Sequence, residues 1–242
     1  MSFESPTFAP LYRQIKSLMI QALESGEWRP GQMIPSEQEL ASRFNVSQGT
    51  VRKAIDEMAA DNYLIRRQGK GTFVASHSDP RALFRFLRLT PINGDIVPLQ
   101  SEPLDCWRAK AGQEASRNLA IEPGVPIIIV RRVLKHDAKP ILVDEIYLPG
   151  DVFQGLNIEM LKDWRGSIYG LFESRFGVRM LSAREKIRAV AADRNVAETL
   201  GVAEGVPLLS VERVAFTYGD KPLEWRRGLY STAEHYYLNE LS

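Results

Sequence analysis

Apolar residues recur at intervals of three and four along the first sixty positions, and this period predicts three helices. The first covers residues 11–25. The second follows Ser36, which precedes Glu39 by three residues in the pattern of a capping box, and it stops near Asn45. The third begins after Ser47, a second N-cap candidate. Two helices joined by so short a connection predict a helix-turn-helix.

A β-hairpin is predicted directly after the third helix. The runs YLIRRQ (63–68) and TFVA (72–75) are typical of short strands, and they flank a tip with two glycines, Gly69-Lys70-Gly71. A hairpin at this place, next to a helix-turn-helix, is a wing. The first part of the chain is therefore predicted to be a winged helix-turn-helix.

The expected boundary between domains is the segment 77–84, which is polar at its start and contains Pro80. We expect a first domain over residues 1–76 and a second over residues 85–242. In the second domain, runs rich in β-branched residues predict two hairpins, over 126–148 and 206–231. Helices are expected at 167–176 and 194–200, whereas 184–192 fits either a strand or a helix. The fold class is thus two-domain α+β, with an antiparallel sheet in the second domain.

Two segments of the second domain resemble each other. EPGVPIIIVRRV (122–133) and AEGVPLLSVERV (203–214) each combine a helix end, a Gly-Val-Pro turn and a strand. The similarity reflects either a duplicated αβ element or shared turn chemistry alone, and we favour turn chemistry.

Composition narrows the class of protein. The chain has 242 residues, 44% hydrophobic and 25% charged, as in ordinary globular proteins of one or two domains. It has no apolar run long enough for a membrane span and no secretory signal, so we expect a cytoplasmic protein without membrane contact. One cysteine and three scattered histidines predict neither a disulfide nor a metal site, and no cofactor is expected.

Charge distribution points to a polyanion partner for the first domain. The net charge is only +1, but the sole charged residues between 62 and 76 are Arg66, Arg67 and Lys70. Such a purely basic patch suits phosphate groups.

Residues 35–74, PSEQELASRFNVSQGTVRKAIDEMAADNYLIRRQGKGTFV, closely resemble the winged helix-turn-helix of the GntR family of bacterial transcription regulators. The resemblance covers both caps, the apolar spacing and the RRQGKGTFV wing. It implies sequence-specific binding to double-stranded DNA. The positions that the family uses at DNA correspond here to Ser36, Gln38, Ser47, Gln48, Thr50, Arg52 and Gly69.

The residue chemistry agrees with this resemblance. The first turn of the third helix, from Ser47 to Thr50 and including Gly49, presents short polar groups and backbone N–H groups that can approach phosphates and base edges. Arg52 suits guanine, whereas Lys53 suits a phosphate. In the wing, glycines allow close approach and cations neutralise phosphates, and these residues are Arg66, Arg67, Gly69, Lys70 and Gly71. The plainer alternative is a simple N-cap with ordinary surface charges.

Gln48 departs from the family pattern. The family usually has Val-Ser-Arg-x-Thr-Val-Arg, and this chain has Gln48 where that pattern has its first arginine. Glutamine pairs best with N6 and N7 of adenine. We therefore expect an operator that differs from the common family consensus at the base that faces Gln48.

Residues from about 84 to 241 resemble the UTRA ligand-sensing domain of the HutC subfamily, which is similar to the chorismate lyase fold. The segments that carry this resemblance are EPGVPIIIVRRVL, KPILVDEIYLPGDVF, SIYGLFESRFGV, LGVAEGVPLLSVERVAF and KPLEWRRGLY. The resemblance implies binding of a small effector without turnover.

Six residues are candidates for the effector site: Arg132, Asp144, Tyr169, Glu224, Arg226 and Tyr230. In the family, arginines on the first strand bind a carboxylate or phosphate, and an acid on the second strand takes hydroxyl or amine groups. This chain has Leu134 where a second arginine is frequent and Asp144 where glutamate is usual. With one cation fewer, sugar phosphates are less favoured as effectors and small carboxylates remain suitable. The alternative is that the ion pairs only hold the sheet and the tyrosines only fill the core.

Together these features predict a one-component transcription regulator. A homodimer would bind a near-palindromic operator and would change its grip when a metabolite fills the second domain, with repression as the default. One alternative is a lyase or hydrolase that acts on small carboxylates, but the sequence shows no nucleophile–base pair and so no catalytic residue. A second alternative is a nonspecific architectural DNA-binding protein.

Overall fold

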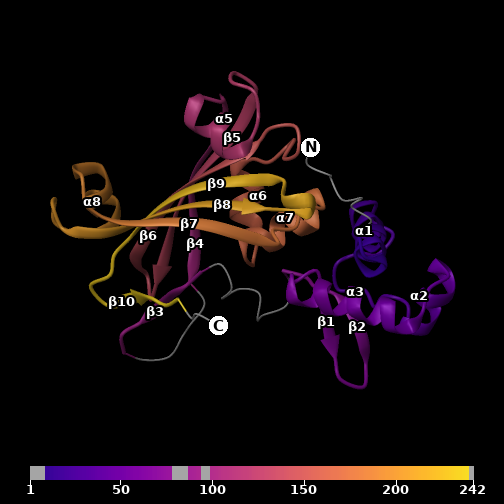
Figure 1. Ribbon diagram of the computed structural model, residues 1–242. Helices are drawn as coiled ribbons and strands as arrows, with labels where there is room; N and C mark the ends of the chain where they lie inside the picture. Colours follow the sequence, from indigo (N-terminus) through magenta and orange to yellow (C-terminus); the bar gives the residue numbers. More distant parts are fainter. Residues whose placement is uncertain (1–8, 78–86, 94–98, 240–242) are drawn as a thin grey trace, which may run out of the picture. The chain divides into compact units, whose positions relative to one another are not determined.

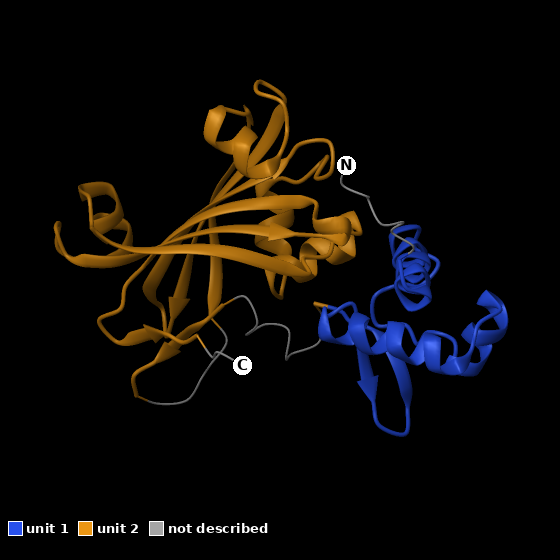
Figure 2. Cartoon of the chain, in the orientation of Figure 1, with its two compact units in different colours: residues 1–76 blue, residues 77–242 orange. Residues whose placement is uncertain are grey.

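The computed structural model describes residues 9–77, 87–93 and 99–239, which form two compact units, 1–76 and 77–242 (Figures 1 and 2). Of the expected linker 77–84, only His77 lies among the described residues. The first unit has the predicted element order of a winged helix-turn-helix. Its elements are α1 (Leu11–Glu24), α2 (Glu37–Phe44), α3 (Gln48–Ala60), β1 (Leu64–Arg67) and β2 (Gly71–Val74).

Both predicted N-caps are confirmed. The Ser36 hydroxyl accepts a hydrogen bond from the Glu39 backbone N–H at 3.2 Å, and the Glu39 carboxylate accepts one from the Ser36 N–H at 2.8 Å, which completes the capping box of α2. The Ser47 hydroxyl accepts from the Thr50 N–H at 3.2 Å and so caps α3. Asn45 adopts the left-handed conformation at the end of α2, which reverses the chain within a short turn.

The wing is fastened to the turn that precedes α2. Strands β1 and β2 pair from Leu64↔Val74 to Arg67↔Gly71. The Ile34 N–H donates to the Thr72 carbonyl at 3.0 Å, and the Val74 N–H donates to the Gln32 carbonyl at 2.8 Å. Strand β2 is thus paired on both of its edges, with β1 on one side and residues 32–34 on the other, whereas the hairpin tip is exposed.

A six-stranded antiparallel sheet in the order β4-β5-β6-β9-β8-β7 forms the second unit, together with the short pair β3–β10 (Figure 1). The two predicted hairpins are confirmed as β5–β6 and β8–β9, and the ambiguous segment 184–192 belongs mostly to strand β7. The turn between β5 and β6 consists of Asp137 and Ala138, both with positive φ. The strands are β3 (Leu89–Pro91), β4 (Gln100–Lys110), β5 (Pro126–His136), β6 (Lys139–Pro149), β7 (Ser182–Ala191), β8 (Pro207–Phe216), β9 (Pro222–Tyr230) and β10 (His235–Tyr237).

Helices cover parts of both faces of this sheet. Leu171 and Phe172 of α7 pack with Val130 and Ile146 on one face. On the other face, α5 packs near one end of the sheet and α8 near the other. The bounds of these helices are α5 (Gln113–Leu119), α6 (Ile158–Asp163), α7 (Ile168–Phe176) and α8 (Arg194–Leu200), and a 3-10 turn spans Tyr218–Asp220.

The two similar sequence segments lie in a repeated structural unit. Strands and helices follow each other as β4-α5-β5-β6 and again as β7-α8-β8-β9. In the first copy, Ala111 N–H donates to the Val125 carbonyl at 2.9 Å, and in the second, Ala192 N–H donates to the Val206 carbonyl at 2.9 Å. Because the likeness extends beyond the turn, the structure favours a duplicated unit over the shared turn chemistry that we had favoured.

Candidate functional site

The tip of α3 presents its polar residues outward. Gln48 and Gly49 are exposed, while Val51 and Ile55 on the opposite side of the helix are buried. The hydroxyl oxygens of Ser47 and Thr50 lie 2.9 Å apart, so the cap and the first turn form one compact polar end. The helix thus begins with short hydroxyl side chains at its exposed end.

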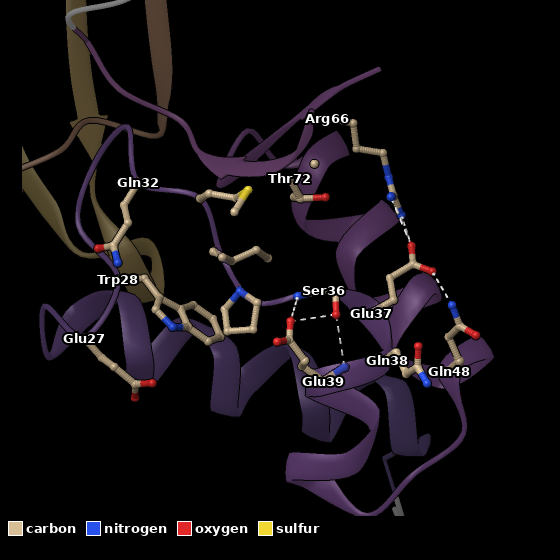
Figure 3. Close-up of a pocket in the computed structure, with 14 residues that line it drawn as sticks. Glu27, Trp28, Gln32, Ser36, Glu37, Gln38, Glu39, Gln48, Arg66 and Thr72 are labelled. Atoms are coloured by element: carbon tan, nitrogen blue, oxygen red, sulfur yellow. Dashed lines mark hydrogen bonds and ion pairs between the residues drawn. The ribbon is translucent and has the colours of Figure 1, made fainter. Parts of the chain in front are cut away.

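Glu37, which the sequence analysis did not single out, joins the helix tip to the wing. One of its carboxylate oxygens accepts from Arg52 Nε at 2.9 Å and from Gln48 Nε2 at 3.3 Å. The other accepts from both terminal nitrogens of Arg66 at 3.1 Å (Figure 3). Although desolvation acts to raise the pKa of Glu37, hydrogen bonds from Arg52 and Arg66 hold that pKa below its ordinary value. Glu37 is therefore ionised at neutral pH.

The remaining candidate cations lie in different surroundings. Arg66 also donates to Asp56, with a shortest distance of 2.7 Å. The guanidinium of Arg67 lies over the Phe73 ring, 4.6 Å from its centroid. Lys53 Nζ lies 4.1 Å from the centroid of the Tyr12 ring. At the exposed hairpin tip, the backbone turns through Gly69 and Gly71, both with positive φ, on either side of Lys70.

Several of the predicted DNA-binding residues line one pocket of the first unit. Figure 3 shows this pocket between the start of α2, the tip of α3 and the strands of the wing. The predicted residues among those that line it are Ser36, Gln38, Gln48, Arg66 and Gly71. The structure thus brings these parts of the prediction together, while Lys53 lies against α1 and Lys70 lies at the far end of the hairpin.

In the second unit, five of the six effector candidates form one buried network. Arg132 donates two parallel hydrogen bonds to Asp144, from Nε to Oδ1 at 2.9 Å and from Nη2 to Oδ2 at 3.0 Å. Arg226 donates to Asp144 at 3.1 Å and to both oxygens of Glu224 at 2.9 Å. The Tyr169 hydroxyl of α7 donates to Glu224 at 2.9 Å.

Strand register brings these side chains to one face of the sheet. Arg132 is directly opposite Asp144 across β5–β6, and Arg226 is opposite Ile146 across β6–β9. Residues two apart on a strand share a face, so Glu224 and Arg226 lie on the same side, as predicted. Tyr230 shares that face; it is buried, and its ring meets the Tyr237 ring edge-on at 6.1 Å.

Burial and charge set the protonation states of this network. Desolvation acts to raise the pKa of Asp144, but the charges of Arg132 and Arg226 hold it below its ordinary value. Burial, followed by the negative charge of Glu224, raises the pKa of Tyr169, so its hydroxyl keeps the proton that it donates. Asp144 is therefore ionised where it accepts hydrogen bonds from Arg132 and Arg226.

Arg213 and Glu185 extend the charged network and were missed by the sequence analysis. Arg213 lies opposite Arg226 across β8–β9 and donates to Glu185 Oε1 from Nε at 2.7 Å. The signal for Arg213 was present, because it aligns with Arg132 in the two similar segments. A small pocket between strands β4–β5 and helices α6–α7 opens beside Arg132, and Ser101 and Trp164 help to line it.

Two family models match this chain. The model of the UTRA domain matches residues 98–236, and the model of the bacterial regulatory proteins of the gntR family matches residues 11–74. The chain belongs to the GntR family. As a GntR regulator with a UTRA domain, it joins a DNA-binding unit to a unit for a small-molecule effector.

Relatives of this GntR regulator support the same conclusion. It is 30% identical to the probable fructoselysine utilization operon transcriptional repressor of Escherichia coli (strain K12), over 88% of this chain and 87% of that protein. It is 24% identical to the transcriptional repressor NagR of Bacillus subtilis (strain 168), over the full length of both. The names of these relatives are those of transcription regulators, so the regulatory interpretation holds and the lyase or hydrolase alternative is not supported.

Solved structures agree with the fold. The ligand-binding domain of a putative GntR-family regulator from Bordetella bronchiseptica has a TM-score of 0.64 and 45% identity, and the match covers 65% of this chain and 98% of that chain. The possible transcriptional regulator YydK from Bacillus subtilis matches 97% of this chain and 100% of its own, with a TM-score of 0.58 and 19% identity, and shows the fold alone. Among the described residues, no helix of this GntR regulator is long and apolar enough to cross a membrane.

Proposed function

We propose that this protein is a cytoplasmic repressor of the HutC subfamily that binds a near-palindromic operator as a homodimer. The observation that carries the proposal is that one chain contains two separate candidate sites. The first is a polar helix tip with a basic wing, and the second is a buried network of forked arginines and acids. A chain with both sites suits a protein whose affinity for DNA depends on a bound small molecule.

On the DNA side, the tip of α3 enters the major groove and the wing follows the phosphate backbone. The geometry supports this assignment because the tip carries short polar side chains and exposed Gln48, whose amide can both donate and accept. Symmetry of the dimer would match symmetry of the operator. The DNA-binding unit is taken as residues 1–76.

On the effector side, we propose a small carboxylate as the ligand. The fork of Arg132 fits a carboxylate, and a small hollow lined in part by Ser101 lies beside it. Asp144 and Glu224 are the acceptors for a hydroxyl or amine on the same molecule. When the ligand enters, Arg132 would release Asp144 and bond to the ligand instead. The effector unit is taken as residues 85–242.

The experiment is a DNA-binding titration with the full chain. A duplex that covers the region upstream of its own gene is titrated with protein alone, and then with small carboxylates and their neutral amides. The proposal predicts that at least one carboxylate shifts the dissociation constant and that its amide does not. Equal effects of acid and amide would contradict the proposed effector class.

A further inference from the structure

Glu37 lies where α2, α3 and the wing meet, and three side chains of the proposed DNA-reading surface donate hydrogen bonds to its carboxylate. We propose that Glu37 is a positioning residue for sequence recognition. It sets the arrangement in which Gln48 and Arg52 meet the bases while Arg66 follows the backbone. This inference deepens the proposed function and rests on it.

The geometry divides the carboxylate between the two DNA-reading elements. Oε2 serves α3 through Arg52 and Gln48, and Oε1 serves the wing through Arg66. The Glu37 side chain is 16% exposed, whereas those of Arg52 and Arg66 are 58% and 41% exposed. The acid is thus set back in the protein, and the cations extend past it toward solvent.

An acid at this place needs a reason, because a negative charge close to a DNA-binding surface repels phosphates. The start of α2 makes the charge tolerable for folding, since the helix N-terminus favours an anion. That local benefit does not explain the contacts to Gln48, Arg52 and Arg66, which come from 11, 15 and 29 residues away in sequence.

Holding the DNA-reading side chains in their bound arrangement would give the Glu37 carboxylate a function. Long side chains lose conformational freedom when they bind, and a group that is already held in its bound arrangement loses less. For Gln48 there is a further effect. One amide hydrogen bonds to Glu37, which leaves the second hydrogen and the amide oxygen for the donor–acceptor pair of an adenine edge.

Asp56 and Glu57 provide matched comparisons within the same unit. Asp56 accepts hydrogen bonds from Arg66, whereas Arg52 and Gln48 donate to Glu37 instead. Glu57 lies one residue further along α3 and pairs instead with Lys16 at 3.3 Å. Neutralising Glu57 therefore changes the net charge by the same amount as neutralising Glu37, without touching the three donors.

The test measures affinity for two duplexes at one fixed salt concentration. The first is the duplex that the wild type selects from a random pool, and the second is a scrambled duplex of equal length. The variants are Glu37→Gln, Glu37→Asp, Asp56→Asn and Glu57→Gln, each with a melting temperature as a check on folding. The readout is the ratio of the two affinities, which a purely structural role would leave unchanged.

Loss of positioning by Glu37→Gln should lower this ratio by about tenfold, because bidentate base contacts carry discrimination of that order. Affinity for the scrambled duplex should rise, since one negative charge is lost. Glu37→Asp keeps the charge but shortens the reach, so it should lower the ratio without that rise. Glu57→Gln should raise scrambled-duplex affinity and keep the ratio, and Asp56→Asn should lower the ratio less than Glu37→Gln does.

An unchanged ratio in Glu37→Gln and Glu37→Asp, with the wild type still selective, would overturn the positioning role alone. A ratio that falls equally in Glu57→Gln would overturn it as well, since charge and not position would then be the cause. A wild type that prefers no duplex would overturn the proposed operator function, and the role of Glu37 with it.

Discussion

Tyr169 of α7 donates its phenolic hydrogen bond to Glu224 of β9 at 2.9 Å, across the face of the sheet that carries the buried network. The Tyr169 ring also lies 5.3 Å from the ring of His77, the first residue of the second unit. His77 is fastened in turn by a bond from its N–H to Glu173 at 2.9 Å and by one from the Met180 N–H to its Nε2 at 3.1 Å. The same helix therefore contacts both the candidate effector site and the start of its own unit.

Replacing Tyr169 with phenylalanine should lower the free energy of unfolding by about 1 kcal/mol, the usual net worth of one hydrogen bond. The loss stays modest because Arg226 still donates to the same Glu224 oxygen. Urea denaturation measures it, with Tyr236→Phe as the control, since Tyr236 is 44% exposed. Equal stability of the two variants would mean that the bond to Glu224 contributes nothing.

Asp144→Asn should destabilise the protein by about 3 kcal/mol, because Arg132 and Arg226 then remain buried beside a neutral side chain. The pKa of Asp144 is lowered in the folded protein, so its stabilising contribution is complete above its ordinary value of 3.8 and is lost as pH falls through the folded pKa.

Acid denaturation curves check the sign of this effect. Wild type should lose stability more steeply than Asp144→Asn as pH falls below 3.8. The exposed Glu122 serves as control, and Glu122→Gln should follow the wild type. Parallel curves for wild type and Asp144→Asn would show that the pKa of Asp144 is not lowered by folding.

The two glycines of the wing should differ in their tolerance of a side chain. A Cβ at Gly71 would lie 3.1 Å from the Met33 sulfur at a φ of +106°, whereas a Cβ at Gly69 would meet no atom within 4 Å. Gly71→Ala should therefore cost about 2 to 3 kcal/mol and Gly69→Ala about 1 kcal/mol. Thermal unfolding of both variants gives the comparison, and a larger loss at Gly69 would refute the assignment of strain.

Gln48→Arg should change which operator is preferred. Arginine pairs with O6 and N7 of guanine, so the base that faces position 48 should change from adenine to guanine. Repeating the selection from random duplexes with the variant measures this. Lys70→Gln is the control, because it should weaken binding to all sequences alike and reduce the salt slope by about one. If the variant selects the wild-type sequence, Gln48 does not read a base.

The parts of the fold that follow from neighbouring residues could be predicted from the sequence. Ser36 and Ser47 cap their helices by accepting hydrogen bonds from backbone N–H groups three residues away. The two glycines of the wing tip predict a turn from the local sequence alone. Strand β4 was not predicted, because Pro103 interrupts it and the strand lies at the sheet edge with a largely exposed surface. Segment 184–192 was ambiguous for a similar reason, since β7 is the opposite edge of the sheet.

The candidate sites depend on contacts between positions that are distant in sequence, so their residues could be predicted only in part. Glu37 bonds to Arg66 from 29 residues away, and Arg213 bonds to Glu185 from 28 residues away, so no local period marks either pair. Arg132 and Asp144 could be placed together because a hairpin fixes their register. The internal repeat was the one signal that could have added Arg213.

Selection of random duplexes by the full-length wild type tests the central claim most directly. The claim is that two copies of this chain read DNA through the tip of α3 and the wing. We expect an enriched inverted repeat whose half-sites are about one helical turn apart, bound by two chains per duplex. Enrichment of no sequence, or of an asymmetric site bound by one chain, would contradict it.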